Sequence, residues 1–204
     1  MLKRFGAPVF FSLAAFLILV ISIYKAAAVQ YVFSKNINEI DYPDDIEISY
    51  QLPSVEMRQD NIFWSLQALK DKVWVDSSAN NVIESERLLN LADNRLVNAK
   101  SFIKEGRFEE GVTALTKAEK YLEGSYDVLL NVDSSTSNYS DLFVTFVTAT
   151  LKHREVIEGI MAEIPEDARP VVTRALDIPK LLYLQCEEQA KEDGIEIPKN
   201  PFEN

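Results

Sequence analysis

The sequence predicts an all-α fold: an N-terminal transmembrane helix followed by an extracytoplasmic bundle of four to six helices. A run of twenty residues near the N-terminus carries no charge. Apolar residues then recur at steps of three and four along most of the chain, which is the period of a helix face. With 6 Gly and 8 Pro in 204 residues, the chain does not fit a turn-rich all-β protein. We expect an anchor (1–25), an acidic stalk (26–60), the bundle (61–192) and a polar tail (193–204).

The charge and the cysteine count exclude several classes of function. The chain carries 32 acidic and 21 basic residues, a net charge of −11. Residues 1–25 contain three basic and no acidic residues, so the remainder carries −14. Such a domain repels nucleic acid phosphates, and we expect no nucleic acid partner. One Cys and one His cannot build a disulfide framework or a Cys/His zinc cluster within one copy.

The uncharged run spans residues 5–24, which as a helix reach about 30 Å, the thickness of a bilayer core. Lys3 and Arg4 precede it and favour a cytoplasmic N-terminus. The alternative is a cleaved signal peptide, because residues 26–28 are alanines that offer an A-x-A site. The run exceeds a typical signal core of about 7–15 residues, so we favour an uncleaved single-pass anchor. Both interpretations place the remaining domain outside the cytoplasm, the first at the cell membrane.

The segment after the anchor has the composition of a stalk. Residues 36–60 carry seven acids against a single Arg58, and Pro43 and Pro53 interrupt them. The alternation over residues 46–50 is compatible with an isolated extended piece. We expect this segment to lift the bundle off the membrane.

The first bundle helix is expected over about residues 61–76. Its apolar residues share one helix face, at steps of four, three and four: Ile62, Leu66, Leu69 and Val73. Trp64 and Trp74 lie beside that face. Core packing is the favoured interpretation of these tryptophans, and a groove for a peptide or a lipid contact is the alternative. Residues 76–78 break the pattern and are expected to cap the next helix.

A long antiparallel helical hairpin is the clearest element, formed by residues 79–105 and 108–132. Each helix has an apolar stripe, with Leu89, Ala92, Leu96, Ala99 and Ile103 on the first and Phe108, Val112, Leu115, Leu122, Tyr126 and Leu129 on the second. Gly106 is expected to end the first helix in a left-handed conformation. Gly111 and Ala118 are small enough for the two helices to approach closely.

Two further helices are expected after a polar loop. The one over about residues 139–164 has a continuous seam: Phe143, Phe146, Thr150, His153, Ile157, Ile160 and Ile164. Pro165 should end it and begin the last helix, with Glu166 and Asp167 in the first turn, where they suit the helix dipole. Pro170 is tolerated only in that first turn. Pro179 should kink or break the helix and leave a final piece to about residue 191. The tail is expected to fray.

Six segments stand out in order along the chain: Leu52-Pro53, WSLQALKDKVW (64–74), LADNRLVNAK (91–100), GRFEE (106–110), KHREVIE (152–158) and IPEDAR (164–169). In these segments the chain resembles a bacterial family of membrane-anchored extracytoplasmic helical domains of unknown function. The segments cover most of residues 52–176. The chain departs in a longer stretch after Leu52-Pro53 and in Gly111, where alanine is expected. The resemblance implies topology and location, and it brings no catalytic residues. The hairpin turn also resembles one tetratricopeptide repeat, with no second copy near 34 residues away.

Few residues of the sequence are candidates for catalysis, metal binding or disulfide formation. His153 lies in an apolar seam, and a metal there would find Cys186 as its only other soft ligand. We favour a hydrogen-bonded structural His153 and a buried Cys186, with metal binding and an intermolecular disulfide as the alternatives. Neighbouring acids such as Glu109 and Glu110 point about 100° apart on a helix and do not converge. No catalytic, cofactor-binding or metal-binding residue is therefore assigned.

We expect a protein that is not an enzyme, because no nucleotide-binding loop, nucleophile elbow or HExxH is present. The favoured hypothesis is a protein-protein interaction or scaffold module of the cell envelope, held in the membrane by residues 5–24, that binds a protein partner or itself. The alternative is a secreted or periplasmic sensor of a small ligand or metal, with its site around His153 and the tryptophan helix. An exposed apolar patch favours the first and an enclosed pocket of about 300 Å³ or more favours the second.

Overall fold

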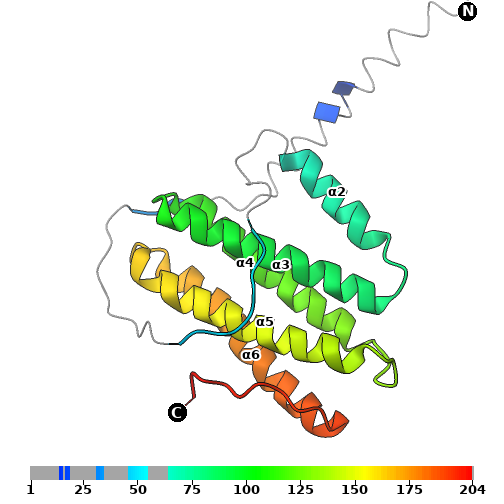
Figure 1. Ribbon diagram of the computed structural model, residues 1–204. Helices are drawn as coiled ribbons and strands as arrows, with labels where there is room; N and C mark the ends of the chain where they lie inside the picture. The colour runs from blue at the N-terminus through cyan, green and yellow to red at the C-terminus, as the bar shows by residue number, and fades with distance from the viewer. Residues whose placement is uncertain (1–13, 16, 19–30, 35–45, 55–63, 204) are drawn as a thin grey trace, which may run out of the picture. The chain divides into compact units, whose positions relative to one another are not determined.

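The computed structural model describes residues 14–15, 17–18, 31–34, 46–54 and 64–203. Every regular element beyond residue 31 in these segments is helical, which confirms the all-α prediction for them (Figure 1). The elements are α2 (Trp64–Asp76), α3 (Asn81–Lys104), α4 (Phe108–Leu129), α5 (Tyr139–Ile160), the 3₁₀ turn η2 (Met161–Glu163) and α6 (Arg169–Asp193). The chain divides into two units, Met1–Tyr31 and Val32–Asn204, and the second contains all of these helices.

Most of the predicted anchor lies outside the described residues. Ala14, Ala15, Leu17 and Ile18 are helical, and the rest of residues 5–24 and the alanines at 26–28 are not described. Among the residues that are described, no helix combines the length and the apolar character needed to cross a membrane. The anchor and its cleavage alternative stay predictions.

The hairpin of α3 and α4 forms as predicted, and every residue of its two apolar stripes is buried. The first helix ends in a Schellman motif around Gly106, whose φ is +73°. There the Arg107 N–H donates to Phe102 O at 2.9 Å, and the Gly106 N–H donates to Ile103 O at 2.9 Å. Gly111 lies where the helices meet, since a Cβ there would come within 2.5 Å of Ile103 Cγ1. The sharp turn and the missing side chain together bring the two helices into close contact.

The start of α3 differs from the prediction. Asn80, rather than residues 76–78, is the N-cap, and its side-chain oxygen accepts a hydrogen bond from the Ile83 N–H at 3.0 Å. The hydroxyls of Ser77 and Ser78 donate backwards to Trp74 O and Val75 O. These serines therefore satisfy the last carbonyl groups of α2 and terminate that helix.

The predicted seam of α5 is confirmed, because all seven of its residues are buried. The start of α6 is not as predicted, since Glu166 and Asp167 precede the helix in a turn. In that turn Ala168 N–H donates to Pro165 O at 3.1 Å and Arg169 N–H to Glu166 O at 3.2 Å. Pro170 lies in the first turn of α6, where its missing N–H costs no hydrogen bond.

The prediction that Pro179 divides the last helix is wrong. α6 runs continuously through 25 residues with Pro179 inside it and buried. A proline removes one backbone hydrogen bond, but the buried face of α6 packs against the bundle on both sides of it through Leu176 and Leu182. Tertiary packing, which supplies most helix stability in proteins, outweighs the local penalty.

Two segments without regular structure lie on the bundle. Residues 46–54, which we name the strap, contain a tight turn in which the Tyr50 N–H donates to Ile48 O at 2.8 Å, and their Ile48 is buried in the core cluster. The Ile48 N–H donates to Glu155 Oε2 at 2.6 Å, and Lys152 Nζ donates to Ile48 O at 3.3 Å. The tail does not fray as expected: Phe202 packs partly buried against the core, and the Tyr183 hydroxyl donates to Pro198 O at 2.9 Å.

Candidate functional site

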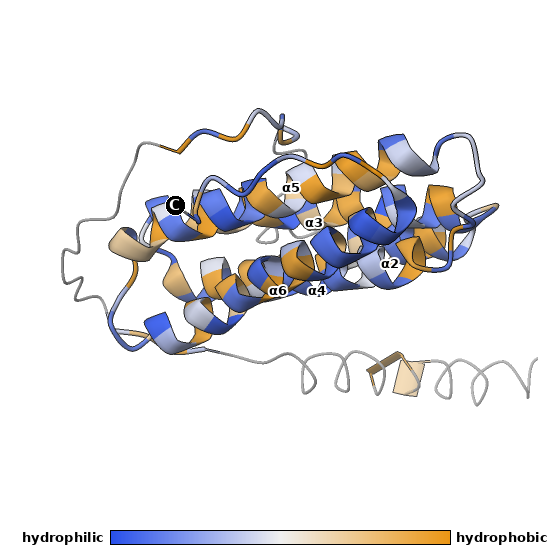
Figure 2. Ribbon diagram, turned by 90° about the horizontal axis from the view of Figure 1, so that it is seen from below, coloured by the Kyte–Doolittle hydropathy of each residue, from blue (hydrophilic) through white to orange (hydrophobic). Residues whose placement is uncertain are grey.

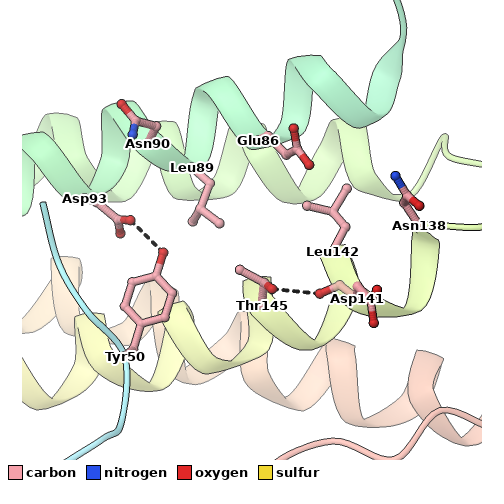
Figure 3. A pocket seen from close by; sticks show the side chains of 9 residues that line it. All are labelled: Tyr50, Glu86, Leu89, Asn90, Asp93, Asn138, Asp141, Leu142 and Thr145. Atoms are coloured by element: carbon pink, nitrogen blue, oxygen red, sulfur yellow. Dashed lines mark hydrogen bonds between the residues drawn. The ribbon is translucent and has the colours of Figure 1, made fainter.

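A buried polar network lies in the middle of the bundle. His153 of α5 is fully buried, with Nδ1 2.8 Å from Glu119 Oε1 of α4 and Nε2 3.1 Å from Asp93 Oδ1 of α3. Figure 3 shows Tyr50 of the strap pointing at Asp93, whose Oδ2 accepts from the Tyr50 hydroxyl at 2.7 Å. Three helices and the strap thus meet in one chain of hydrogen bonds. His153 is buried and hydrogen-bonded, as we favoured.

Asp93 and Glu119 determine the protonation state of the His153 imidazole. Burial by itself lowers the pKa of His153, but the charge of Glu119 and the hydrogen bonds that the imidazole donates to Asp93 and Glu119 raise it to about 9. Burial also raises the pKa of Glu119, and the neighbouring His153 offsets part of that increase. Desolvation and the neighbouring Asp93 raise the pKa of Tyr50 well above its usual value, so its hydroxyl stays a donor. At neutral pH the His153 imidazole is therefore protonated, and both of its ring nitrogens are hydrogen-bond donors.

Both carboxylates occupy seam positions of their helices, although neither belongs to the predicted apolar stripes. Asp93 follows Leu89 by four residues and precedes Leu96 by three, and Glu119 has the same spacing from Leu115 and Leu122. The spacing of three and four residues that predicts a buried position for His153 also predicts buried positions for Asp93 and Glu119. A charged residue is expected at the protein surface when the sequence shows no partner for it, because burying an unpaired charge costs free energy. The pairing that removes this cost is visible only in three dimensions.

A hollow of about 430 Å³ lies beside the network, between α3 and α5 (Figure 3). Its lining is mostly polar and consists of Tyr50, Glu86, Leu89, Asn90, Asp93, Asn138, Asp141, Leu142 and Thr145. Tyr50 and Asp93 belong to both the hollow and the network. The hollow is open to solvent and borders the network at Tyr50 and Asp93.

A second buried ion pair holds α2 on α3. Arg95 Nη2 lies 2.8 Å from Asp71 Oδ2, and both side chains are buried. Arg87 adds a hydrogen bond to Trp74 O and places its guanidinium 5.0 Å from the centre of the Trp74 ring. Val75 of α2 is also buried. Removing one partner of a buried pair costs about 3–5 kcal/mol because it leaves an uncompensated charge, so the observed orientation of α2, which keeps Asp71 against Arg95, avoids that cost.

The apolar side of α2 therefore faces away from the bundle. The predicted face exists, but Leu66, Leu69 and Val73 are 65%, 59% and 59% exposed. Trp74 is 38% exposed, and the side chain of Trp64 lies outside the described residues. A groove of about 560 Å³ runs along this side, lined by Leu66, Gln67, Leu69, Lys70, Val73, Trp74 and Ser77. We name this surface the α2 outer face, and Figures 1 and 2 show its helix beside α3.

Cys186 of α6 is buried, as favoured. Burial raises the pKa of its thiol to about 12, so the reactive thiolate is scarce at neutral pH. In the part of the chain that the structure describes, no three His, Cys, Asp or Glu side chains form a group that could hold a metal ion. Both nitrogens of His153 are already occupied by carboxylates.

Comparison with known proteins gives no further guide to this surface or to the buried network. No family model matches the chain, and no curated protein or solved structure is significantly similar to it. The assignment of a function thus depends on the geometry of the described residues and on the sequence pattern.

Proposed function

We propose that the protein is a single-pass, N-terminally anchored interaction module whose exported helical domain binds a protein partner in the cell envelope. The observation that carries the proposal is the α2 outer face. Three large aliphatic side chains at helical spacing are each more than half exposed, beside a partly exposed tryptophan. Exposed apolar patches on otherwise polar domains mark sites of interaction with proteins or membranes.

The location is proposed from the sequence. The uncharged run of residues 5–24 follows Lys3 and Arg4, which favours a cytoplasmic N-terminus. The domain behind it carries a charge of −14, which disfavours nucleic acid and anionic lipid as binding partners of the domain as a whole. We therefore propose a protein as the partner of this apolar surface.

The alternative, a sensor of a small ligand or metal around His153, has less support. A metal ligand needs an unprotonated nitrogen, and both nitrogens of His153 are bound to carboxylates. The tryptophan helix contributes an open groove outside the bundle, so the two parts of that hypothetical site lie apart. The solvent-facing hollow beside Tyr50 is the place where a ligand of this kind would be sought.

Site-specific photocrosslinking in cells tests the proposal. A photoreactive amino acid at Leu69 should give one reproducible crosslinked protein in the membrane fraction. The matched control is Leu181 on α6, which is exposed to the same 59% and should give none. Equal crosslinking at both positions would contradict a specific α2 interface. The intact mass of the purified chain, measured together with its extraction from membranes, decides between an anchor and a signal peptide cut after Ala28.

A further inference from the structure

The α2 outer face has the spacing of a coiled-coil seam. Leu66, Leu69 and Val73 follow one another by three and four residues, which is the a, d, a order of a heptad. Ile62 extends the same order in the sequence, four residues before Leu66. A strict a/d stripe is narrower than the apolar face of a helix that packs into a globular core. This spacing fits a partner helix.

The opposite side of α2 is fixed to the bundle, so the seam cannot turn inward. In the same heptad Asp71 takes the f position, which points directly away from the a and d residues. Its carboxylate lies 2.8 Å from Arg95 Nη2 in a buried pair. Rotating α2 to bury the leucines would expose this pair and would carry Asp71 out of reach of Arg95. Outward presentation of the seam is therefore built into the fold.

Lysines flank the seam on both sides. Lys70 and Lys72 take the e and g positions, about 75–85° to either side of the seam at about 100° per residue. Both side chains are exposed, and Lys72 Nζ is 2.9 Å from Asp76 Oδ2 in a surface pair. Such pairs contribute little and exchange readily with other carboxylates. The flanks of the seam are thus basic on a domain that is strongly acidic overall.

The charges of Lys70 and Lys72 distinguish between two candidate partners of the α2 outer face, a second copy of the chain and a helix of another protein. In a parallel pair with a second copy, Lys72 at g would face Ser77 at the following e position, and in an antiparallel pair lysines would face lysines, so neither orientation gives these lysines an opposite charge. A partner helix with Glu or Asp at its own e and g positions would meet opposite charges. We propose that the α2 outer face binds an amphipathic helix of a protein partner, with an apolar a/d seam and acidic e/g positions. This rests on the proposed function and names the partner's chemistry.

Two designed helical peptides provide the test. Both carry leucine at a and d over three heptads, one with Glu and the other with Lys at every e and g position. Each is labelled with fluorescein and titrated with the full-length chain in neutral phosphatidylcholine nanodiscs, and binding is followed by fluorescence anisotropy. The Glu peptide should bind at least tenfold more tightly than the Lys peptide. The double variant Lys70→Glu/Lys72→Glu should reverse the preference, because it exchanges attraction and repulsion.

Two variants test whether peptide binding depends on the apolar residues of the seam. The double variant Leu69→Ser/Val73→Ser should abolish binding of the Glu peptide, and Leu181→Ser on α6 should leave it unchanged. These positions are exposed, so none of the changes should unfold the domain, which circular dichroism verifies.

Other outcomes overturn the inference. Equal binding of the two peptides, or no binding, would exclude an acidic helical partner. Concentration-dependent dimerisation that is lost in the Leu69→Ser/Val73→Ser variant would assign the seam to a second copy. Quenching of Trp74 by brominated phosphatidylglycerol in a Trp64→Phe background would assign it to the lipid surface. If the residue at position 69 crosslinks a protein in cells but the Glu peptide does not bind, the proposed function is supported. The inference that the partner is an acidic amphipathic helix is then wrong.

Discussion

His153 Nδ1 lies 2.8 Å from Glu119 Oε1, and neither side chain has any measurable exposure to solvent. A titrating pair is thereby placed inside the hydrophobic core, with Asp93 on the other ring nitrogen at 3.1 Å. Buried charges are tolerated only when partners satisfy them, so the protonation state of His153 is linked to the folded state of the bundle.

The first prediction concerns the charge on this histidine. Because His153 is the only histidine of the chain, its imidazole proton signals are unique in an NMR spectrum. They should titrate with a pKa of about 9, well above the usual value of 6.5. Glu119→Gln keeps a hydrogen-bond acceptor but removes the largest source of the increase, and it should lower the pKa by one unit or more. An unchanged pKa in this variant would show that Glu119 does not hold the charge.

The second prediction is the pH dependence of stability that follows from the same pKa. A pKa of 6.5 in the unfolded chain and about 9 in the folded chain means that folding favours the protonated ring. The stabilisation is complete below about pH 6.5 and is lost as the pH rises through 9. The free energy of unfolding from urea titrations should fall by roughly 3 kcal/mol between pH 6.5 and 9.5. His153→Gln, which cannot titrate, should remove most of this slope.

The third prediction concerns the strap. Tyr50→Phe deletes the hydroxyl that donates to Asp93 Oδ2 at 2.7 Å and leaves the ring in place. A hydrogen bond to a charged acceptor contributes about 1.5–3 kcal/mol, and water entering the hollow replaces part of it, so we expect a loss of about 1–2 kcal/mol. A double-mutant cycle with Asp93→Asn isolates the pair. Strictly additive effects of the two substitutions would mean that Tyr50 stabilises the bundle by packing alone.

The fourth prediction uses two glycines as a matched pair. A Cβ at Gly111 would lie 2.5 Å from Ile103 Cγ1 and 3.3 Å from Ala99 O, whereas one at Gly124 would only reach Leu88 Cδ1 at 3.9 Å. Gly111→Ala should therefore destabilise the protein by about 1–3 kcal/mol, although alanine favours helices. Gly124→Ala should stabilise it by up to about 1 kcal/mol through helix propensity. Thermal denaturation distinguishes the two, and stabilisation by Gly111→Ala would show that the helices can separate without cost.

The helices of the bundle and their buried stripes could be predicted from the sequence because periodicity reports directly on which face is buried. His153 was placed correctly for this reason. Asp93 and Glu119 have the same seam spacing but were not recognised, since a single helix cannot show that a buried charge has a partner on another. The spacing of Leu66, Leu69 and Val73 defines a face without saying whether the bundle or another molecule covers it. That orientation depends on the pairing of Asp71 with Arg95, 24 residues further along the chain.

The strap has a kinetic consequence. The turn at Gly106 joins α3 to α4 directly, so the hairpin closes a short loop, whereas the bond from Ile48 to Glu155 joins residues 107 positions apart. Closing the longer loop costs more chain entropy and depends on α5 already being in place. The hairpin should therefore assemble early and the strap should dock last. In the folded protein we expect the strap, which docks last, to open first. The amides of Ile48 and Tyr50 should therefore exchange with deuterium long before those of α3 and α4.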